Sequence, residues 1–151
     1  MNLQMEINSL KQRIAELEQQ AKQEQEFPQY GDTYWCINAY GGVSKETWDG
    51  YDIEKDMLVI GNGFRTEQEA EFAVEKLKVE AELRKFSRPF VDGEENNHIK
   101  YSPSFDELSV LTSFSYQDQG VFYFESKEKV QQAIESVGAD RIKKYIFGVE
   151  E

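Results

Sequence analysis

The sequence predicts an α+β fold, in which an antiparallel sheet built from two strand–strand–helix units is packed by helices and preceded by an N-terminal coiled-coil helix. Three observations predict it. A heptad pattern occupies residues 3–21, strand-like runs come after it, and two similar helix starts lie sixty residues apart. We therefore expect a coiled-coil helix over residues 1–26 and an α+β domain over residues 29–151.

The N-terminal helix carries its apolar residues at alternating spacings of four and three. Positions a hold Ile7, Ile14 and Ala21, and a β-branched residue at a with leucine at d favours a parallel two-stranded coil. In a parallel homodimer, Glu6 would face Lys11 of the other copy, and Arg13 would face Glu18. The alternative is that this helix folds back on its own domain. The predicted dimerisation residues are Leu3, Ile7, Leu10, Ile14, Leu17 and Ala21.

The domain begins with short runs that favour β-strands. Residues 34–37 form a β-favouring run before the turn signal Gly41-Gly42, and residues 57–60 form a second apolar run before Gly61-Asn62-Gly63. We expect strands at both runs. In the second half, strands are expected over residues 98–102, over the alternating stretch 108–116, and over 121–124.

Two helices have clear start signals. Thr66 with Glu69 three residues later forms a capping box, and the helix is expected to run to about Phe86, before Pro89. Ser126 is the N-cap of a second helix that Gly138 ends. A last short helix is expected over residues 140–147.

The two halves of the domain resemble each other. Sixty residues apart, Phe64 matches Phe124 and Thr66 matches Ser126, and the apolar residues of the two helices that begin there match as well. A true duplication and two independently similar units both explain this match. In either case the local geometry is expected to repeat.

The helix after Thr66 is apolar on two faces. One face, which we expect against the sheet, consists of Ala70, Ala73, Val74, Leu77 and Ala81. The second stripe consists of Phe72, Val79, Leu83 and Phe86. Either the C-terminal Ile142, Tyr145, Ile146 and Phe147 cover this stripe, or it contacts a second copy or another partner.

Charge limits the classes of partner. The chain has 17 basic and 29 acidic residues, a net charge of −12, of which −10 lies after residue 28. Such a surface repels phosphate backbones, so we expect no direct nucleic-acid binding; a basic partner protein fits better. The candidate partner surface adds the turn residues Trp48 and Tyr51 and the acidic turn Asp92, Glu94 and Glu95 to the second stripe.

No motif predicts catalysis, a metal or a cofactor. The chain has one histidine, His98, expected on the surface, and one cysteine, Cys36, so neither a Cys/His zinc cluster nor an internal disulfide can form. Gly61-Asn62-Gly63 lacks the remaining glycine of a dinucleotide-binding loop. The sequence therefore favours a binding protein over an enzyme. The aromatic residues between 34 and 51 leave a small-molecule or nucleotide pocket as an alternative.

Nothing in the sequence indicates a membrane protein, because no run of 18 apolar residues occurs and the N-terminus is rich in Gln and Glu. The phrases TYWCINAYGG, GNGFRTEQEAE and DRIKKYIFG, with the strand VFYF and its serine cap, resemble small acidic proteins encoded by phages and prophages of Gram-positive bacteria. The resemblance covers about residues 33–149. It implies the cytoplasm of a bacterial host.

Some small acidic phage proteins bind and block host nucleic-acid enzymes, CRISPR nucleases among them, and this is an analogy by class and not by motif. Our leading hypothesis is a non-enzymatic homodimer that engages and inhibits such a host defence nuclease through its acidic surface. The alternatives are a phage structural or assembly accessory protein and a small-molecule or nucleotide binder.

Overall fold

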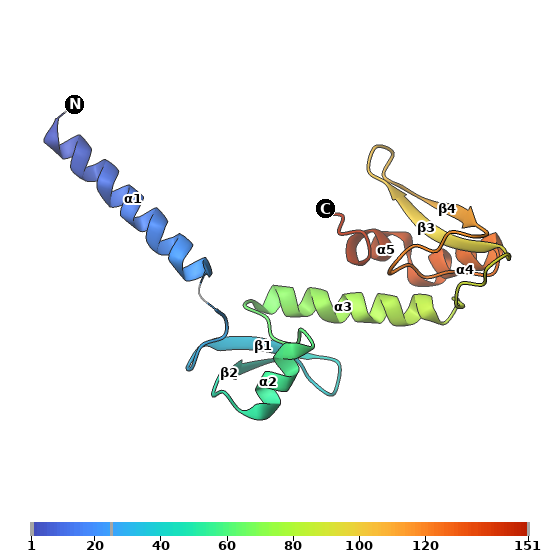
Figure 1. The fold of residues 1–151 in the computed structure, drawn as a ribbon, viewed down its shortest axis with the longest axis horizontal. Helices are drawn as coiled ribbons and strands as arrows, with labels where there is room; N and C mark the ends of the chain where they lie inside the picture. Colours follow the sequence, from blue (N-terminus) through green and yellow to red (C-terminus); the bar gives the residue numbers. More distant parts are fainter. Residues whose placement is uncertain (1, 25, 151) are drawn as a thin grey trace. The chain divides into compact units, whose positions relative to one another are not determined.

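The computed structural model describes residues 2–24 and 26–150 (Figure 1). Within them, five helices and two two-stranded sheets confirm the α+β class, although the strands are divided between two sheets where we expected one. Contacts divide the chain into two compact units. Unit 1 contains the residues up to Cys36 and Lys45–Arg65, and unit 2 contains Ile37–Ser44 and the residues from Thr66 onward.

The first element is α1 (Leu3–Glu24), at the place where the heptad predicts a helix. The Asn2 side chain caps it, because its Oδ1 accepts a hydrogen bond from the Met5 backbone N–H at 2.9 Å. Glu6 lies in the first turn and Lys22 in the last, and both charges suit the helix dipole.

Unit 1 also contains helix α2 (Asp52–Val59) and most of the paired strands β1 (Thr33–Ile37) and β2 (Val43–Thr47), whose connecting residues Ile37–Ser44 belong to unit 2. After α2 the chain returns to β1, where the backbones of Trp35 and Phe64 exchange hydrogen bonds of 2.8 and 2.9 Å. The core of this unit is small and largely aromatic; it consists of Tyr34, Cys36 and Trp48, with Phe27, Met57 and Leu58 packed against them.

The prediction of a strand at residues 57–60 is wrong, because residues 57–59 form the last turn of α2. Four consecutive apolar residues fit a buried strand and a helix end equally well. The deciding interaction lies upstream, where the Glu54 carboxylate accepts a hydrogen bond from the Tyr51 backbone N–H at 3.0 Å and so fixes the first turn of the helix. β2 was not expected from the sequence.

Unit 2 contains the antiparallel hairpin of β3 (Asn96–Ser102) and β4 (Glu107–Ser113), which pair from Asn96↔Ser113 to Ser102↔Glu107. Both strands agree with the predictions to within three residues at each end. The strand expected over 121–124 is reduced to isolated bridges, since Tyr123 pairs with Arg88 and Phe124 with Asn97.

Three helices pack with this hairpin: α3 (Glu67–Arg84), α4 (Lys127–Val137) and α5 (Ala139–Tyr145) (Figure 1). All three lie close to the predicted ranges. Their buried core consists of Val79, Leu83, Phe124, Val130, Ala133, Val137 and Ile142. Ile99, Leu108 and Val110 of the hairpin pack against this core.

The expected local repeat is present. Phe64 and Phe124 each bridge the first strand of the preceding hairpin, at Trp35 and Asn97 respectively. Two residues further on, the hydroxyl of Thr66 accepts from the Glu69 N–H at 3.2 Å. In the same way the Ser126 hydroxyl accepts from the Lys129 N–H at 3.1 Å. The two copies differ in the segment that leads from the hairpin to the bridging phenylalanine. In the first copy this segment contains the helix α2, and in the second its described residues contain no helix.

A single glycine joins α4 to α5. Gly138 has φ of +101°, in the left-handed region, and its N–H bonds to the Ile134 carbonyl at 2.9 Å. The turn directs α5 back along α3, where the Arg141 guanidinium lies 2.6 Å from the Glu82 carboxylate. The C-terminal segment thereby becomes part of the core of unit 2.

Candidate functional site

The apolar seam of α1 is the largest uncovered apolar surface that the sequence predicted to be functional. All six predicted dimerisation residues are exposed, with Leu3 at 72%, Leu10 at 64% and Ile14 at 55% exposure. A single copy therefore leaves a stripe of leucine and isoleucine in water along the whole helix. Contiguous exposed apolar residues of this kind are typical of a protein–protein interface.

The charged residues beside this seam are available for a second chain. Within the described residues, Glu6, Lys11 and Glu18 form no side-chain hydrogen bond or ion pair. Arg13 makes one exposed contact, 3.4 Å from the Glu16 carboxylate. Exposed pairs of this kind contribute only about 0.2–1 kcal/mol, so Arg13 can exchange this partner for another at little cost.

The second apolar stripe of α3 is not a free surface. Val79 and Leu83 are buried in the core of unit 2, and Phe86 packs against it, so these residues are not available to a partner. Phe72 is 39% exposed and its ring lies 5.0 Å from that of Tyr145. The C-terminal segment covers the stripe, as in the first of the two interpretations that the sequence allowed.

The face that we expected against the sheet divides between core and solvent. Ala70 and Val74 are buried, but Leu77 is 54% exposed and Ala81 is also exposed. The prediction for these last two residues is wrong. The buried side of α3 is set by α4 and α5, which lie more than forty residues further along the chain.

Trp48 and Tyr51 separate in the structure. Trp48 is buried against Tyr34, with the two rings edge-on at 5.7 Å, whereas Tyr51 is 65% exposed. The expectation of an exposed Trp48 is wrong, and with Tyr34 also buried these rings fill the core of unit 1. They form no open aromatic pocket for a base or another small molecule.

The acidic turn interacts with other residues of unit 2. Asp92, Glu94 and Glu95 are all exposed. Glu94 nevertheless lies 3.9 Å from the Arg88 guanidinium, and Glu95 accepts a hydrogen bond from the Asn97 amide at 3.1 Å. The turn is therefore an ordered, partly compensated surface.

A buried asparagine organises this turn, and sequence reasoning missed it. Asn96 is fully buried, and its side-chain oxygen accepts from Arg88 at 2.8 Å and from the Val91 N–H at 2.9 Å. Its amide donates to the carbonyls of Val91 and Glu94 at 2.8 and 2.9 Å. The only signal was the pair Asn96-Asn97, which is equally typical of an exposed turn.

Glu54 is a second buried polar residue that the sequence did not reveal. Its carboxylate accepts hydrogen bonds from the Tyr34 hydroxyl at 2.8 Å and from the N–H groups of Asp49 and Tyr51 at 3.1 and 3.0 Å. Burial alone would raise the pKa of Glu54, but the bonds from Tyr34 and the backbone outweigh it and hold that pKa below its ordinary value. Burial and the same bond raise the pKa of Tyr34.

This network predicts an acid-sensitive unit 1. The lowered pKa of Glu54 means that the unfolded chain binds the proton more readily. The ionised Glu54 carboxylate therefore stabilises the fold above the ordinary glutamate pKa of about 4.3. This stabilisation is lost as the pH falls through the lower pKa that Glu54 has in the folded protein. Glu54→Gln should unfold more easily than the unchanged chain at pH 7 and should lose this pH dependence.

Tryptophan fluorescence during urea unfolding measures this effect directly, because both tryptophans, Trp35 and Trp48, lie in unit 1. Asp56→Asn, at an exposed position of the same helix, is the matched control and should change little. Equal urea midpoints for the two variants at pH 7 would contradict a structural role for the Glu54 carboxylate.

His98 is buried, so the prediction that it lies on the surface is wrong. Its side chain packs edge-on against Tyr123, and its Nε2 lies 3.8 Å from the Asp118 carboxylate. Burial lowers the pKa of His98; Asp118 acts in the opposite direction, and Lys100 adds to the lowering. The imidazole is thus neutral at pH 7 and belongs to the packed interior.

No cluster of three or more His, Cys, Asp or Glu side chains able to hold a metal occurs in the described part of the chain. None of the helices in residues 2–24 and 26–150 has the length and apolar character to cross a bilayer. Comparisons with family models, with curated proteins and with solved structures found no match to this chain.

Proposed function

We propose that this protein is a non-enzymatic, phage-encoded homodimer that binds and inhibits a host protein, in particular a defence nuclease such as a CRISPR nuclease. The uncovered seam of α1 carries the dimer part of the proposal. A parallel partner helix would bury all six seam residues and would bring Glu6 opposite Lys11 and Arg13 opposite Glu18.

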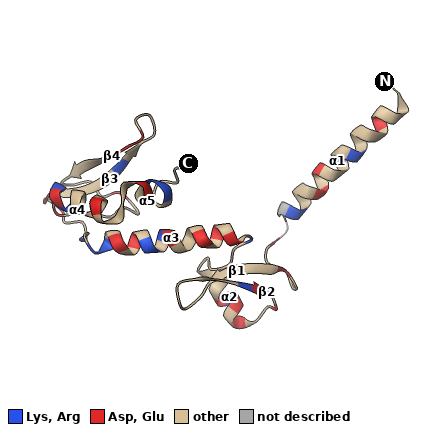
Figure 2. Cartoon of the chain, turned by 180° about the vertical axis from the view of Figure 1, so that it is seen from behind, with Lys and Arg blue, Asp and Glu red and all other residues tan. Residues whose placement is uncertain are grey.

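The binding part of the proposal rests on unpaired negative charge. On α3, Glu67 and Glu71 are exposed and, being four residues apart, share one face, whereas Glu75 on the same face is paired with Lys78 at 3.0 Å. Figure 2 shows the acidic residues along α3 in red. Like charges at this spacing destabilise a helix by about 0.2–0.5 kcal/mol per pair. Two exposed carboxylates that repel each other suit contact with a basic partner.

Dimerisation would strengthen such a contact. Two copies joined through α1 present two acidic faces, so the second contact forms at a high effective concentration once the first is made. The nucleic-acid groove of a nuclease is lined with cations, and it is a surface that a carboxylate-bearing helix can occupy in place of phosphates. The phage resemblance directs the choice toward nucleases of Gram-positive hosts.

The proposal is tested by adding the purified chain to DNA cleavage by CRISPR nucleases from such hosts. We expect cleavage to be lost at about one dimer per nuclease and to return as salt is raised, because added ions screen the contact. Glu67→Gln with Glu71→Gln should weaken inhibition about tenfold or more, since each charged contact contributes about 1 kcal/mol.

The matched control is Glu128→Gln with Glu135→Gln, which removes the same charge from exposed positions of α4. Equal losses of inhibition in the two double variants would point to net charge alone and would contradict a specific α3 face. If the chain binds none of these nucleases, the proposed target is wrong.

A further inference from the structure

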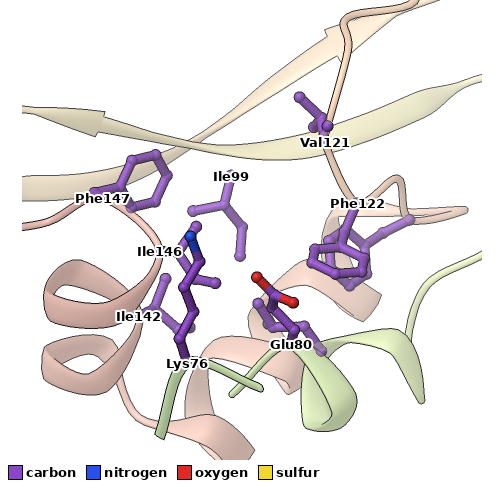
Figure 3. A pocket seen from close by; sticks show the side chains of 11 residues that line it. Lys76, Glu80, Ile99, Val121, Phe122, Ile142, Ile146 and Phe147 are labelled. Carbon is purple, nitrogen blue, oxygen red and sulfur yellow. The ribbon is translucent and has the colours of Figure 1, made fainter. Parts of the chain in front are cut away.

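Unit 2 contains a cavity of about 260 Å³ beside α3 that the proposed function does not use (Figure 3). Its apolar wall is formed by Ile99 of β3, by Val121 and Phe122 ahead of α4, and by Ile142 and Ile146 at the C-terminal end. The volume falls just below the ~300–1,000 Å³ typical of pockets for drug-sized ligands. A ligand that fits it must therefore be small and largely apolar.

Two charged side chains of α3 lie at the edge of this apolar cavity. Lys76 and Glu80 both line it, and Figure 3 shows the ammonium and the carboxylate directed toward the apolar wall. They are four residues apart and so share one face of the helix. Any molecule in the cavity meets one positive and one negative group.

Neither charge has a partner among the described residues. No hydrogen bond or ion pair involves the Lys76 or Glu80 side chain there, although neighbouring charges of the same helix are paired. Lys78 lies 3.0 Å from Glu75, and Glu82 lies 2.6 Å from Arg141. Lysine preceding glutamate by four residues is also the less favourable order for a pair within a helix.

We propose that this cavity binds a small zwitterion with an apolar body, for which an apolar α-amino acid is the simplest case. Its carboxylate would pair with Lys76 and its ammonium with Glu80, while the side chain fills the space lined by Ile99 and Ile142. A plain hydrocarbon would pair with neither of these charges. A simple anion would meet the repulsion of Glu80. The inference does not rest on the proposed nuclease inhibition.

The test is a titration of the full chain with L-phenylalanine, followed through the isoleucine methyl NMR signals of Ile99, Ile142 and Ile146. We expect saturable shifts at these methyls, with a dissociation constant on the order of 1 mM or tighter for a ligand of this size. N-acetyl-L-phenylalanine keeps only the carboxylate, and L-phenylalanine amide keeps only the ammonium. Each should bind about tenfold more weakly, for the loss of one charged contact.

Two variants assign the contacts. In Lys76→Met, the amide should bind as well as the free amino acid, and in Glu80→Gln the N-acetyl compound should do so. Lys78→Met and Glu75→Gln alter the neighbouring pair and should leave all three affinities unchanged. Equal affinities of the three compounds for the unchanged chain would overturn the proposal. So would an absence of shifts at the cavity methyls, or a tighter fit of either single-charge compound.

Discussion

The variant Leu10→Lys with Leu17→Lys is expected to sediment as a monomer at concentrations where we expect the unchanged chain to sediment as a dimer. Both leucines lie on the exposed seam of α1 and would each face their counterpart in a parallel coil. A buried leucine contributes about 1.5–3 kcal/mol, and four are replaced per dimer by mutually repelling ammonium groups. The dissociation constant should therefore rise by about a thousandfold or more.

Gln12→Lys with Gln19→Lys is the matched control, because it adds the same charge to the opposite side of the same helix. Analytical ultracentrifugation should show this control as a dimer. Circular dichroism should also show a loss of helix in the seam variant only, since an isolated helix of about 20 residues is marginal in water. If the seam variant stays dimeric, α1 is not the interface between copies.

Phe124→Ala is expected to have the largest effect on the stability of unit 2. The ring is fully buried in the core shared by α3, α4 and α5, and the Phe124 backbone pairs with Asn97 through hydrogen bonds of 2.8 and 3.0 Å. Removing a buried phenylalanine ring costs about 3–5 kcal/mol. A domain of this size has only about 5–15 kcal/mol of stability, so the variant should be close to unfolding at 37 °C.

Urea unfolding followed by circular dichroism at 222 nm measures this loss, since unit 2 contains α3, α4 and α5. Phe105→Ala is the control, because this ring is 76% exposed, and the substitution should cost less than about 0.5 kcal/mol. Similar midpoints for the two variants would show that Phe124 does not anchor the core.

The helices with side-chain caps were predictable because their start signals are local. Thr66 and Ser126 each accept the N–H three residues later, and this requires no knowledge of the rest of the chain. The strands of the β3–β4 hairpin were equally accessible, since alternation along 108–116 reports one covered face. α2 escaped prediction because its deciding contact, the carboxylate of Glu54, looks in the sequence like any other surface acid.

Predicting which surfaces are free was harder, because it depends on contacts between distant segments. The sequence showed correctly that α3 is apolar on two faces, but Val79 and Leu83 are buried because α4 and α5, from distant parts of the chain, pack with α3. The burial of His98 and Asn96 has the same origin, since polar residues are buried where the fold supplies partners or packing that no local pattern announces. The heptad pattern predicted the helix α1 directly, whereas pairing through its six apolar positions stays a prediction.

The corner at Gly138 restricts how this sequence can diverge. A side chain there would force a backbone conformation that L-amino acids rarely adopt, even though the space around it is nearly open. Substitution of Gly138 is thus disfavoured by the backbone conformation that an L-amino acid would have to adopt, and not by a steric clash with neighbouring atoms. Any codon change that replaces this glycine would strain the turn that returns the C-terminal tail to α3, whatever changes occur on the surface around it.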